Sequence, residues 1–295
     1  MTHTDFSHFV GIDWTGAKGK RHAGLAVAVC EAGEGAPKMV SPPTGHSRWS
    51  RQDCASWLSG GLGRRAGERV LVGIDSSFGM PFVDEGAYLP GDVLPADVKA
   101  LWAHVADLCG PDADFYGGPF VDEHAAYYLR SRGTETLKGP CYSRRMRVPE
   151  QLAVDSGAGP CESVFHLIGP SQVGLSGLST MAMLHHLNRE DHVAIWPFDD
   201  VSDARIVVVE IYAAAFAAMG GHRGKIRDMA ALKPILNRLG TKRMPRLGMG
   251  FTDHAADACV TAAALRQIHH HRKYWNPQAL SAMVRRTEGW VFGIE

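Results

Sequence analysis

The sequence lacks an excess of either charge and any apolar run of membrane-spanning length. Its 31 Lys and Arg residues balance 31 Asp and Glu residues, so no overall basic charge attracts nucleic acid and any such contact must use local patches. A membrane-spanning helix needs about 20 consecutive apolar residues, and no such run occurs. The first residues also lack the basic and apolar segments of a signal peptide. We therefore expect a globular cytoplasmic protein that does not enter a membrane.

Two kinds of motif are missing as well. The six cysteines are scattered, with no Cys-x-x-Cys pair and no Cys/His pair at zinc spacing, which argues against a structural zinc site and indicates reduced thiols. The glycine-rich residues 169–177 precede a predicted helix and could hold a phosphate on backbone N–H groups. They lack the Gly-Lys-Ser/Thr of a P-loop, so they do not match that nucleotide-binding motif.

The motif Gly-Ile-Asp occurs twice, each time at the end of a short apolar run. Residues 9–13 end in Asp13 and residues 70–75 end in Asp75. Short apolar runs that break into small residues are typical of buried strands. The C-terminal ends of strands are where open α/β sheets build their sites. Both runs therefore predict a strand that carries a carboxylate to that edge.

A third strand and a late helix extend this pattern. Residues 205–212 form another apolar run, with Glu210 near its end, and residues 253–269 predict an alanine-rich helix. In that helix Asp253 and His254 lie four and three positions before Asp257, so the three side chains share one face. Clustered carboxylates repel one another unless cations neutralise them, and they favour hard ions, which predicts a Mg²⁺ or Mn²⁺ site. The expected ligands are Asp13, Asp75, Glu210, Asp253 and Asp257.

The remaining pattern predicts a sheet with one long interruption. Further strands are expected at residues 22–30, 38–40, 192–196 and 290–294, and further helices at 50–58, 96–109, 178–188 and from 213. Residues 77–190 are less regular and too long for a loop, so we expect an insertion that folds upon itself and covers one end of the sheet. The core would then consist of residues 1–76 and 191–295.

The order of these elements resembles the ribonuclease H-like fold. Residues 254–258, His-Ala-Ala-Asp-Ala, are similar to the last motif of RuvC-type Holliday-junction resolvases. Together with the two Gly-Ile-Asp phrases and Glu210-Ile211-Tyr212, they more closely resemble an uncharacterised family of predicted ribonuclease H-like nucleases. The resemblance implies an α/β fold with a five-stranded mixed sheet in the order 3-2-1-4-5, flanked by helices, and the insertion after strand 4. It also implies that Asp13, Asp75 and Glu210 are neighbours and that Asp257 approaches them from the helix.

The motifs and the resemblance together favour a divalent-metal-dependent nuclease. Two ions about 4 Å apart suit phosphodiester hydrolysis, because one activates water and the other stabilises the leaving oxygen. The substrate would be DNA or RNA, which the sequence does not distinguish. The expected catalytic residues are Asp13, Asp75, Glu210, His254 and Asp257.

Two other interpretations remain open. Ala213 stands where the family usually has proline, which, with the long insertion, leaves room for a member that binds metal or nucleic acid without cutting it. Residues 11–16 also resemble the first phosphate loop of the actin and sugar-kinase superfamily, which shares this core and handles ATP. Those proteins need a duplicated core, and the sequence shows no second copy.

Local basic stretches are the expected contacts for a nucleic-acid backbone. The segment 222–246 contains eight Lys and Arg residues and a single acid, Asp228. A smaller basic cluster lies in the insertion. Such groups position phosphates without reading sequence, although a solvated helix face would have the same composition. The residues singled out are Arg144, Arg145, Arg147, Lys242, Arg243 and Arg246.

Overall fold

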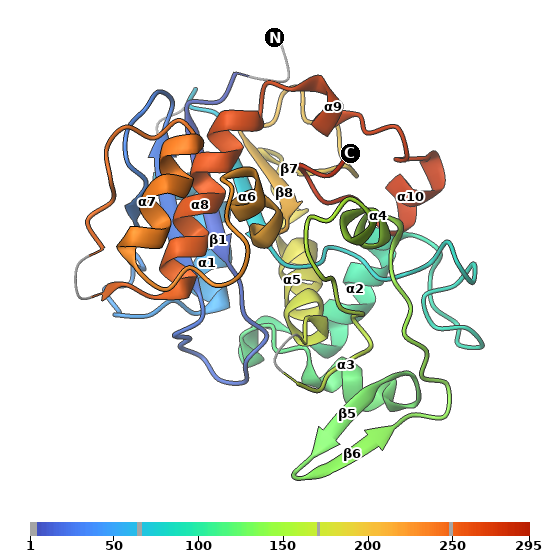
Figure 1. Ribbon diagram of the computed structural model, residues 1–295. Coiled ribbons are helices and arrows are strands. Elements are labelled where there is room, and N and C mark those ends of the chain that lie inside the picture. Colours follow the sequence, from blue (N-terminus) through green and yellow to red (C-terminus); the bar gives the residue numbers. More distant parts are fainter. Residues whose placement is uncertain (1–4, 64–66, 170–171, 248–249) are drawn as a thin grey trace.

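The main element of the protein is a six-stranded mixed sheet in the order β3-β2-β1-β4-β8-β7 (Figure 1). The computed structural model describes residues 5–63, 67–169, 172–247 and 250–295. β1, β2 and β3 pair antiparallel, whereas β4, β8 and β7 follow β1 in parallel. The strands are β1 (His8–Asp13), β2 (Ala26–Glu31), β3 (Lys38–Met39), β4 (Val70–Asp75), β7 (Val193–Trp196) and β8 (Ile206–Ile211).

This sheet confirms the predicted α/β class and is consistent with a ribonuclease H-like core that carries an insertion after β4. The order 3-2-1-4 is as predicted, and β8 occupies the fifth position beside β4. The sheet has one strand more than predicted, because β7 pairs with the outer side of β8. The expected strand at 290–294 is reduced to a single bridge between Val291 and Glu210.

Helices cover both faces of the sheet (Figure 1). Alternating residues of each strand face opposite layers, so Phe9 and Leu71 join the core under one layer, while Val10 and Val72 join the core under the other. The first layer consists of α6 (Ala213–Met219), α7 (Met229–Arg238) and α8 (Asp253–Ile268). The second consists of α1 (Arg51–Ser59), α2 (Val98–Leu108) and α5 (Gly174–Leu187).

Residues 77–190 supply much of the second layer, because they contain α2 and α5. Trp102 of α2 and Leu178 of α5 are buried in the same core as Ile12 and Ile74 of the sheet. The hairpin of β5 and β6 projects away from the sheet (Figure 1). The smaller elements of this segment are α3 (Gly118–Glu123), β5 (Leu129–Arg132), β6 (Glu135–Lys138) and α4 (Val148–Asp155), and the C-terminal ones are α9 (Arg272–Trp275) and α10 (Ala282–Thr287).

Two glycines let α8 lie directly on the central strands. Gly11 and Gly73 are paired in register on β1 and β4. A Cβ atom at Gly11 would lie 2.2 Å from the carbonyl oxygen of Ala258, and one at Gly73 would lie 2.8 Å from the side chain of Leu265. Real Cβ atoms do not approach other atoms so closely, so Gly11 requires glycine against the backbone of α8, whereas a Cβ atom at Gly73 would displace the end of the Leu265 side chain. The close approach brings the first turn of α8 to the C-terminal ends of β1 and β4.

Candidate functional site

Asp13 and Asp75 end adjacent parallel strands at the same level. They are register partners, as are Gly11 and Gly73 two residues earlier. Because side chains alternate along a strand, both aspartates point to the face that α8 covers. The two Gly-Ile-Asp phrases therefore place two carboxylates next to each other, as the pattern predicted.

The N-terminal end of α8 adds His254 and Asp257 to this edge. Thr252 caps the helix by accepting a hydrogen bond from the N–H of Ala255. The His254 Nδ1 atom lies 2.6 Å from a carboxylate oxygen of Asp13. Asp257 follows about one turn later on the same face. Its charge acts on both Asp75 and His254, so it belongs to the same cluster.

Burial and mutual repulsion raise the pKa values of the acids in this cluster. Burial and the charge of Asp13 raise the pKa of Asp257 to about 7. The same two causes raise the pKa of Asp75 well above its ordinary value. Burial also raises the pKa of Asp13, although the hydrogen bond from His254 opposes this. The hydrogen bond to Asp13 in turn raises the pKa of His254.

Asp253 lies at the rim and differs from the other acids. Its carboxylate is 3.2 Å from the Nζ atom of Lys225, whose side chain is largely exposed. Although partial burial opposes the effect, this hydrogen bond and the charge of His254 lower the pKa of Asp253. Asp253 is therefore a neutralised rim residue, whereas no Lys or Arg among the described residues forms an ion pair with Asp13, Asp75 or Asp257.

The donor chemistry of the cluster fits a hard divalent cation. Three carboxylates with raised pKa values lose their mutual repulsion when such an ion binds, and oxygen ligands are those that Mg²⁺ and Mn²⁺ prefer. Within the described part of the chain, however, no three His, Cys, Asp or Glu side chains are already arranged as a metal-binding group. The residues that would hold an ion are Asp13, Asp75 and Asp257, after adjustment of their side chains.

Glu210 lies near these acids, but its carboxylate turns to the other face of the sheet. In the pairing of β4 with β8, Ile211 is level with Asp75, while Glu210 is level with Ile74. Glu210 is 3% exposed and binds both terminal nitrogens of Arg147, with an Nη1–Oε2 distance of 2.9 Å. It also accepts a hydrogen bond from the N–H of Phe78. The negative charge of Glu210 is thus paired with Arg147, so Glu210 does not add a free carboxylate to the cluster.

Arg147 is a buried clamp, and it does not lie on the surface as a phosphate contact would. It donates to Glu150, Glu210 and the backbone of Glu288. Although burial opposes the effect, Glu150 and Glu210 raise the pKa of Arg147, which keeps it charged. Glu288 in turn accepts hydrogen bonds from the backbone N–H groups of Phe82, Val83 and Val148.

The other basic residues singled out from the sequence divide into two groups. Arg145 is buried and donates to Asp84 and to backbone carbonyls, so it too is internal. Arg144 is exposed and paired with Glu162. Lys242, Arg243 and Arg246 lie on the surface, with Lys242 beside Glu34.

Two basic residues at the rim were not among those singled out. Besides Lys225, the exposed Arg223 donates to the backbone oxygen of Gly157 at 2.6 Å. Both belong to the loop between α6 and α7, which borders the first turn of α8. The high density of Lys and Arg after residue 222 was the available signal, but only the packing shows that Lys225 pairs with Asp253 of the cluster.

A cavity of about 490 Å³ opens beside the carboxylates. Asp13, Asp75 and His254 form part of its wall, and the first turn of α5 faces them through Val173 and Ser176. The rest of the wall includes Thr15, Gly16, Ser76, Ser77, Glu150, Cys161, Glu162, Glu210 and Tyr212. The cavity is mostly lined by polar side chains, and it adjoins both the acids and a helix N-terminus.

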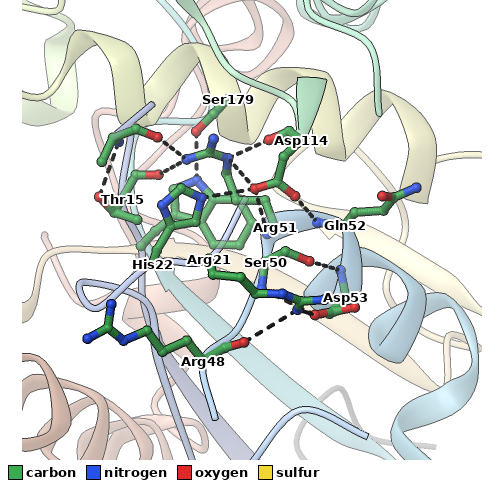
Figure 2. Close-up of polar contacts among 12 residues, drawn as sticks. Thr15, Arg21, His22, Arg48, Ser50, Arg51, Gln52, Asp53, Asp114 and Ser179 are labelled. Atoms are coloured by element: carbon green, nitrogen blue, oxygen red, sulfur yellow. Dashed lines mark hydrogen bonds and ion pairs between the residues drawn. The ribbon is translucent and has the colours of Figure 1, made fainter. Parts of the chain in front are cut away.

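A buried network of hydrogen bonds fixes the loop that follows β1 and borders this cavity (Figure 2). Arg51 is fully buried, and its Nη1 atom donates to the carbonyl oxygens of Thr15 and Ala17 at 2.8 and 3.0 Å. Asp114 accepts hydrogen bonds from the backbone N–H groups of Arg51 and Gln52, and its carboxylate lies 2.9 Å from His22. α1 and a loop of the insertion therefore hold one cavity wall together.

Fold and site together define an α/β protein with a mixed sheet consistent with a ribonuclease H-like core and an acidic cluster at the C-terminal strand edge. No family model matches the chain, and no curated protein or solved structure shows significant similarity to it. None of the helices formed by the described residues is long and apolar enough to cross a membrane.

Proposed function

We propose that this protein is a divalent-cation-dependent nuclease that hydrolyses phosphodiester bonds. The observation that carries the proposal is the convergence of Asp13, Asp75 and Asp257 from three separate segments, with Asp13 and Asp75 in the wall of one cavity. Such a group of partly buried acids without paired lysines or arginines is unfavourable in a protein that binds no cation. The strand order and the position of α8 are consistent with the ribonuclease H-like core, in which carboxylates serve this chemistry.

Each part of the site has a role in this proposal. A bound Mg²⁺ or Mn²⁺ ion supplies the positive charge that activates water and stabilises charge on the phosphate. Asp13, Asp75 and Asp257 would hold it. His254 is partly exposed and touches Asp13, so it can exchange a proton between the site and solvent. Arg223 and Lys225 at the rim attract the backbone phosphates of a nucleic acid.

A protein that binds a cation or nucleic acid without cutting is the second candidate. Glu210 is held by Arg147, so the site offers fewer free carboxylates than the sequence indicated. The described side chains also form no ready group of three ligands. An ATP-handling protein of the actin and sugar-kinase type is less favoured, because the described residues contain one six-stranded sheet and a two-stranded hairpin, without a second core.

The test combines cation binding with cleavage. Purified protein is titrated with Mn²⁺ by calorimetry and then incubated with branched DNA, single-stranded DNA and RNA in Mg²⁺ or Mn²⁺. Asp75→Asn and Asp257→Asn should abolish cleavage and weaken Mn²⁺ binding while the circular dichroism spectrum stays unchanged. Asp112→Asn, which changes an exposed acid in a remote turn, is the matched control.

The outcomes separate the candidates. Cleavage that survives in both variants rejects the proposed site. Binding of Mn²⁺ without cleavage of any substrate favours the non-catalytic candidate. Failure to bind Mn²⁺ at neutral pH rejects the nuclease proposal and a cation-binding role, and retention of DNA or RNA binding under that condition favours a nucleic-acid-binding protein.

A further inference from the structure

Among the described residues that line the cavity beside the carboxylates, one hydroxyl group has no hydrogen-bond partner. Thr15, Ser76, Ser176 and Tyr212 also line it, and the hydroxyl of each takes part in a hydrogen bond. The hydroxyl of Ser77 forms none with any described residue, although Ser77 is only 8% exposed. The Ser77 hydroxyl oxygen is not fully enclosed by other atoms. Since Ser77 lines this cavity, we infer that its hydroxyl group opens into the cavity.

The N-terminus of α5 reaches the same cavity. α5 has 14 residues, and its N-cap residue, Val173, has no side-chain acceptor for the first N–H groups. These N–H groups have no partner within a helix, and the helix dipole adds partial positive charge to them. Val173 and Ser176 of this turn line the cavity, and Gly177 of α5 packs against Ser77. Of the glycine-rich segment 169–177, residues 170 and 171 lie outside the described residues.

Ser77 and the first turn of α5 are both connected to the segments that carry the carboxylates of the site. Ser77 follows Asp75 by two residues. Gly16 follows Asp13 by three residues and packs on α5, where a Cβ atom on it would lie 2.3 Å from the backbone nitrogen of Ser176. The remaining acids of the cavity wall form ion pairs with arginines. Glu150 and Glu210 pair with Arg147, and Glu162 pairs with Arg144.

We propose that Ser77 and the first turn of α5 form an anion subsite that binds a phosphodiester group of the substrate next to the one that is cleaved. The nature of the ligand rests on the proposed nuclease function. The chemistry of the subsite does not, because uncapped N–H groups and a free hydroxyl donate hydrogen bonds to an anionic oxygen. The subsite would hold the backbone in the same cavity that Asp13 and Asp75 line.

The test measures binding without catalysis, in EDTA, so that no divalent ion can hold the probe at the carboxylates. The probe is the dinucleotide TpT, and its uncharged methylphosphonate analogue is the chemical control. We expect TpT to shift the amide resonances of Ser77 and Ser176 in a ¹⁵N NMR titration and to bind more tightly than the analogue. Ser77→Ala should weaken TpT binding about tenfold, because it removes a hydrogen bond to a charged group. Ser56→Ala, on the exposed face of α1, should not.

A second pair of variants tests the helix terminus. Val173→Asp places a carboxylate at the N-cap of α5, where it occupies the free N–H groups and repels an anion. We expect a higher melting temperature and weaker TpT binding in this variant. Val173→Asn caps the helix without a charge, so it should lower the affinity less. A variant that fails to fold would be recognised by its melting curve, and Ser77→Ala would still decide the question.

The results distinguish this subsite from the nuclease proposal. Equal binding of TpT and its methylphosphonate analogue, or unchanged affinity in both Ser77→Ala and Val173→Asp, overturns the subsite even if the protein cleaves nucleic acid. Selective binding of TpT that both variants weaken supports the subsite even if no cleavage is found.

Discussion

Asp257 shows how the environment of a single residue can make the stability of the fold depend on pH, and on the cation that we propose binds there. It lies inside an alanine-rich helix, and burial together with the charge of Asp13 raises its pKa to about 7. In an unfolded chain its pKa would be near the ordinary value of about 4. The folded protein therefore binds more protons than the unfolded chain between these pH values, and this residue lowers the stability as the pH rises through that window.

Replacing Asp257 should remove this pH dependence. In EDTA at pH 8, we expect Asp257→Asn to increase the free energy of unfolding by on the order of 2 kcal/mol, because the neutral amide avoids a partly buried charge. The difference should shrink at pH 5, where the carboxyl group of the wild type is protonated. Urea unfolding at both pH values measures it.

Mg²⁺ provides the complementary control. A cation that binds the folded protein stabilises it by mass action, so Mg²⁺ at pH 8 should raise the melting temperature of the wild type more than that of Asp257→Asn. The remote Asp112→Asn variant should behave like the wild type. A variant that is less stable than the wild type in EDTA at pH 8 would contradict the proposed electrostatic strain.

At the residue scale, the sequence predicted those acids whose position depends on local pattern. Asp13 and Asp75 end apolar runs, and Asp257 shares a helix face with His254, so periodicity predicted each acid at the end of its element. Their proximity was implied by the strand order of the resembling ribonuclease H-like fold. The orientation of Glu210 follows from neither, because it depends on which residue of β8 is level with Asp75. That register is set by tertiary packing, and a shift of one residue reverses the face. The partner of Glu210, Arg147, lies in a segment with no recognisable motif.

At the scale of elements, the packing of α8 on β1 is the contact that positions the site. Gly11→Ala would place a Cβ atom 2.2 Å from the backbone oxygen of Ala258, and the backbone cannot move aside as a flexible side chain would. We expect a loss of about 3 kcal/mol of stability, in the range of overpacked cores, together with weaker Mn²⁺ binding as α8 shifts. Chemical denaturation and calorimetry check the two effects.

Gly35→Ala is the matched control for this prediction. A Cβ atom at Gly35 meets no other atom within 4 Å, so its substitution should change stability by less than about 0.5 kcal/mol. If Gly11→Ala were as stable as Gly35→Ala, the close approach of α8 would not be required for the fold.

The elements themselves were predicted well where pattern and caps agree. β4 spans the predicted residues 70–75, and α1 lies within one residue of the predicted 50–58, where Ser50 caps it in a capping box with Asp53. α5 begins four residues earlier than predicted. The prediction missed this first turn because Gly174 and Gly177 have low helix propensity. Gly174 is required there by packing, since a Cβ atom on it would lie 2.0 Å from the carbonyl oxygen of Val164. Such a tertiary requirement leaves no periodic signal.

At the scale of the whole molecule, the Arg147 clamp joins the insertion to the sheet and to the C-terminal segment. Glu210→Gln leaves Arg147 buried with less compensating charge, so we expect a loss of about 3 kcal/mol in the free energy of unfolding. Cation affinity should change little, because Glu210 is not among the unpaired acids. Urea denaturation and Mn²⁺ calorimetry on the same sample measure both quantities.

Glu162→Gln serves as the control, because it breaks the more exposed pair with Arg144, which should be worth less than about 1 kcal/mol. If Glu210→Gln instead abolished Mn²⁺ binding and left stability unchanged, Glu210 would be a metal ligand, as the sequence pattern alone suggested.

The contact between Asp13 and His254 joins residues that are 241 positions apart. A ribosome adds residues in order, so an emerging chain exposes Asp13 and Asp75 long before α8 leaves the exit tunnel. Until that helix docks, the strand ends hold two acids and lack the third. The three-acid cluster that we propose as the cation site is thereby completed only after α8 has been synthesised and has docked on the sheet.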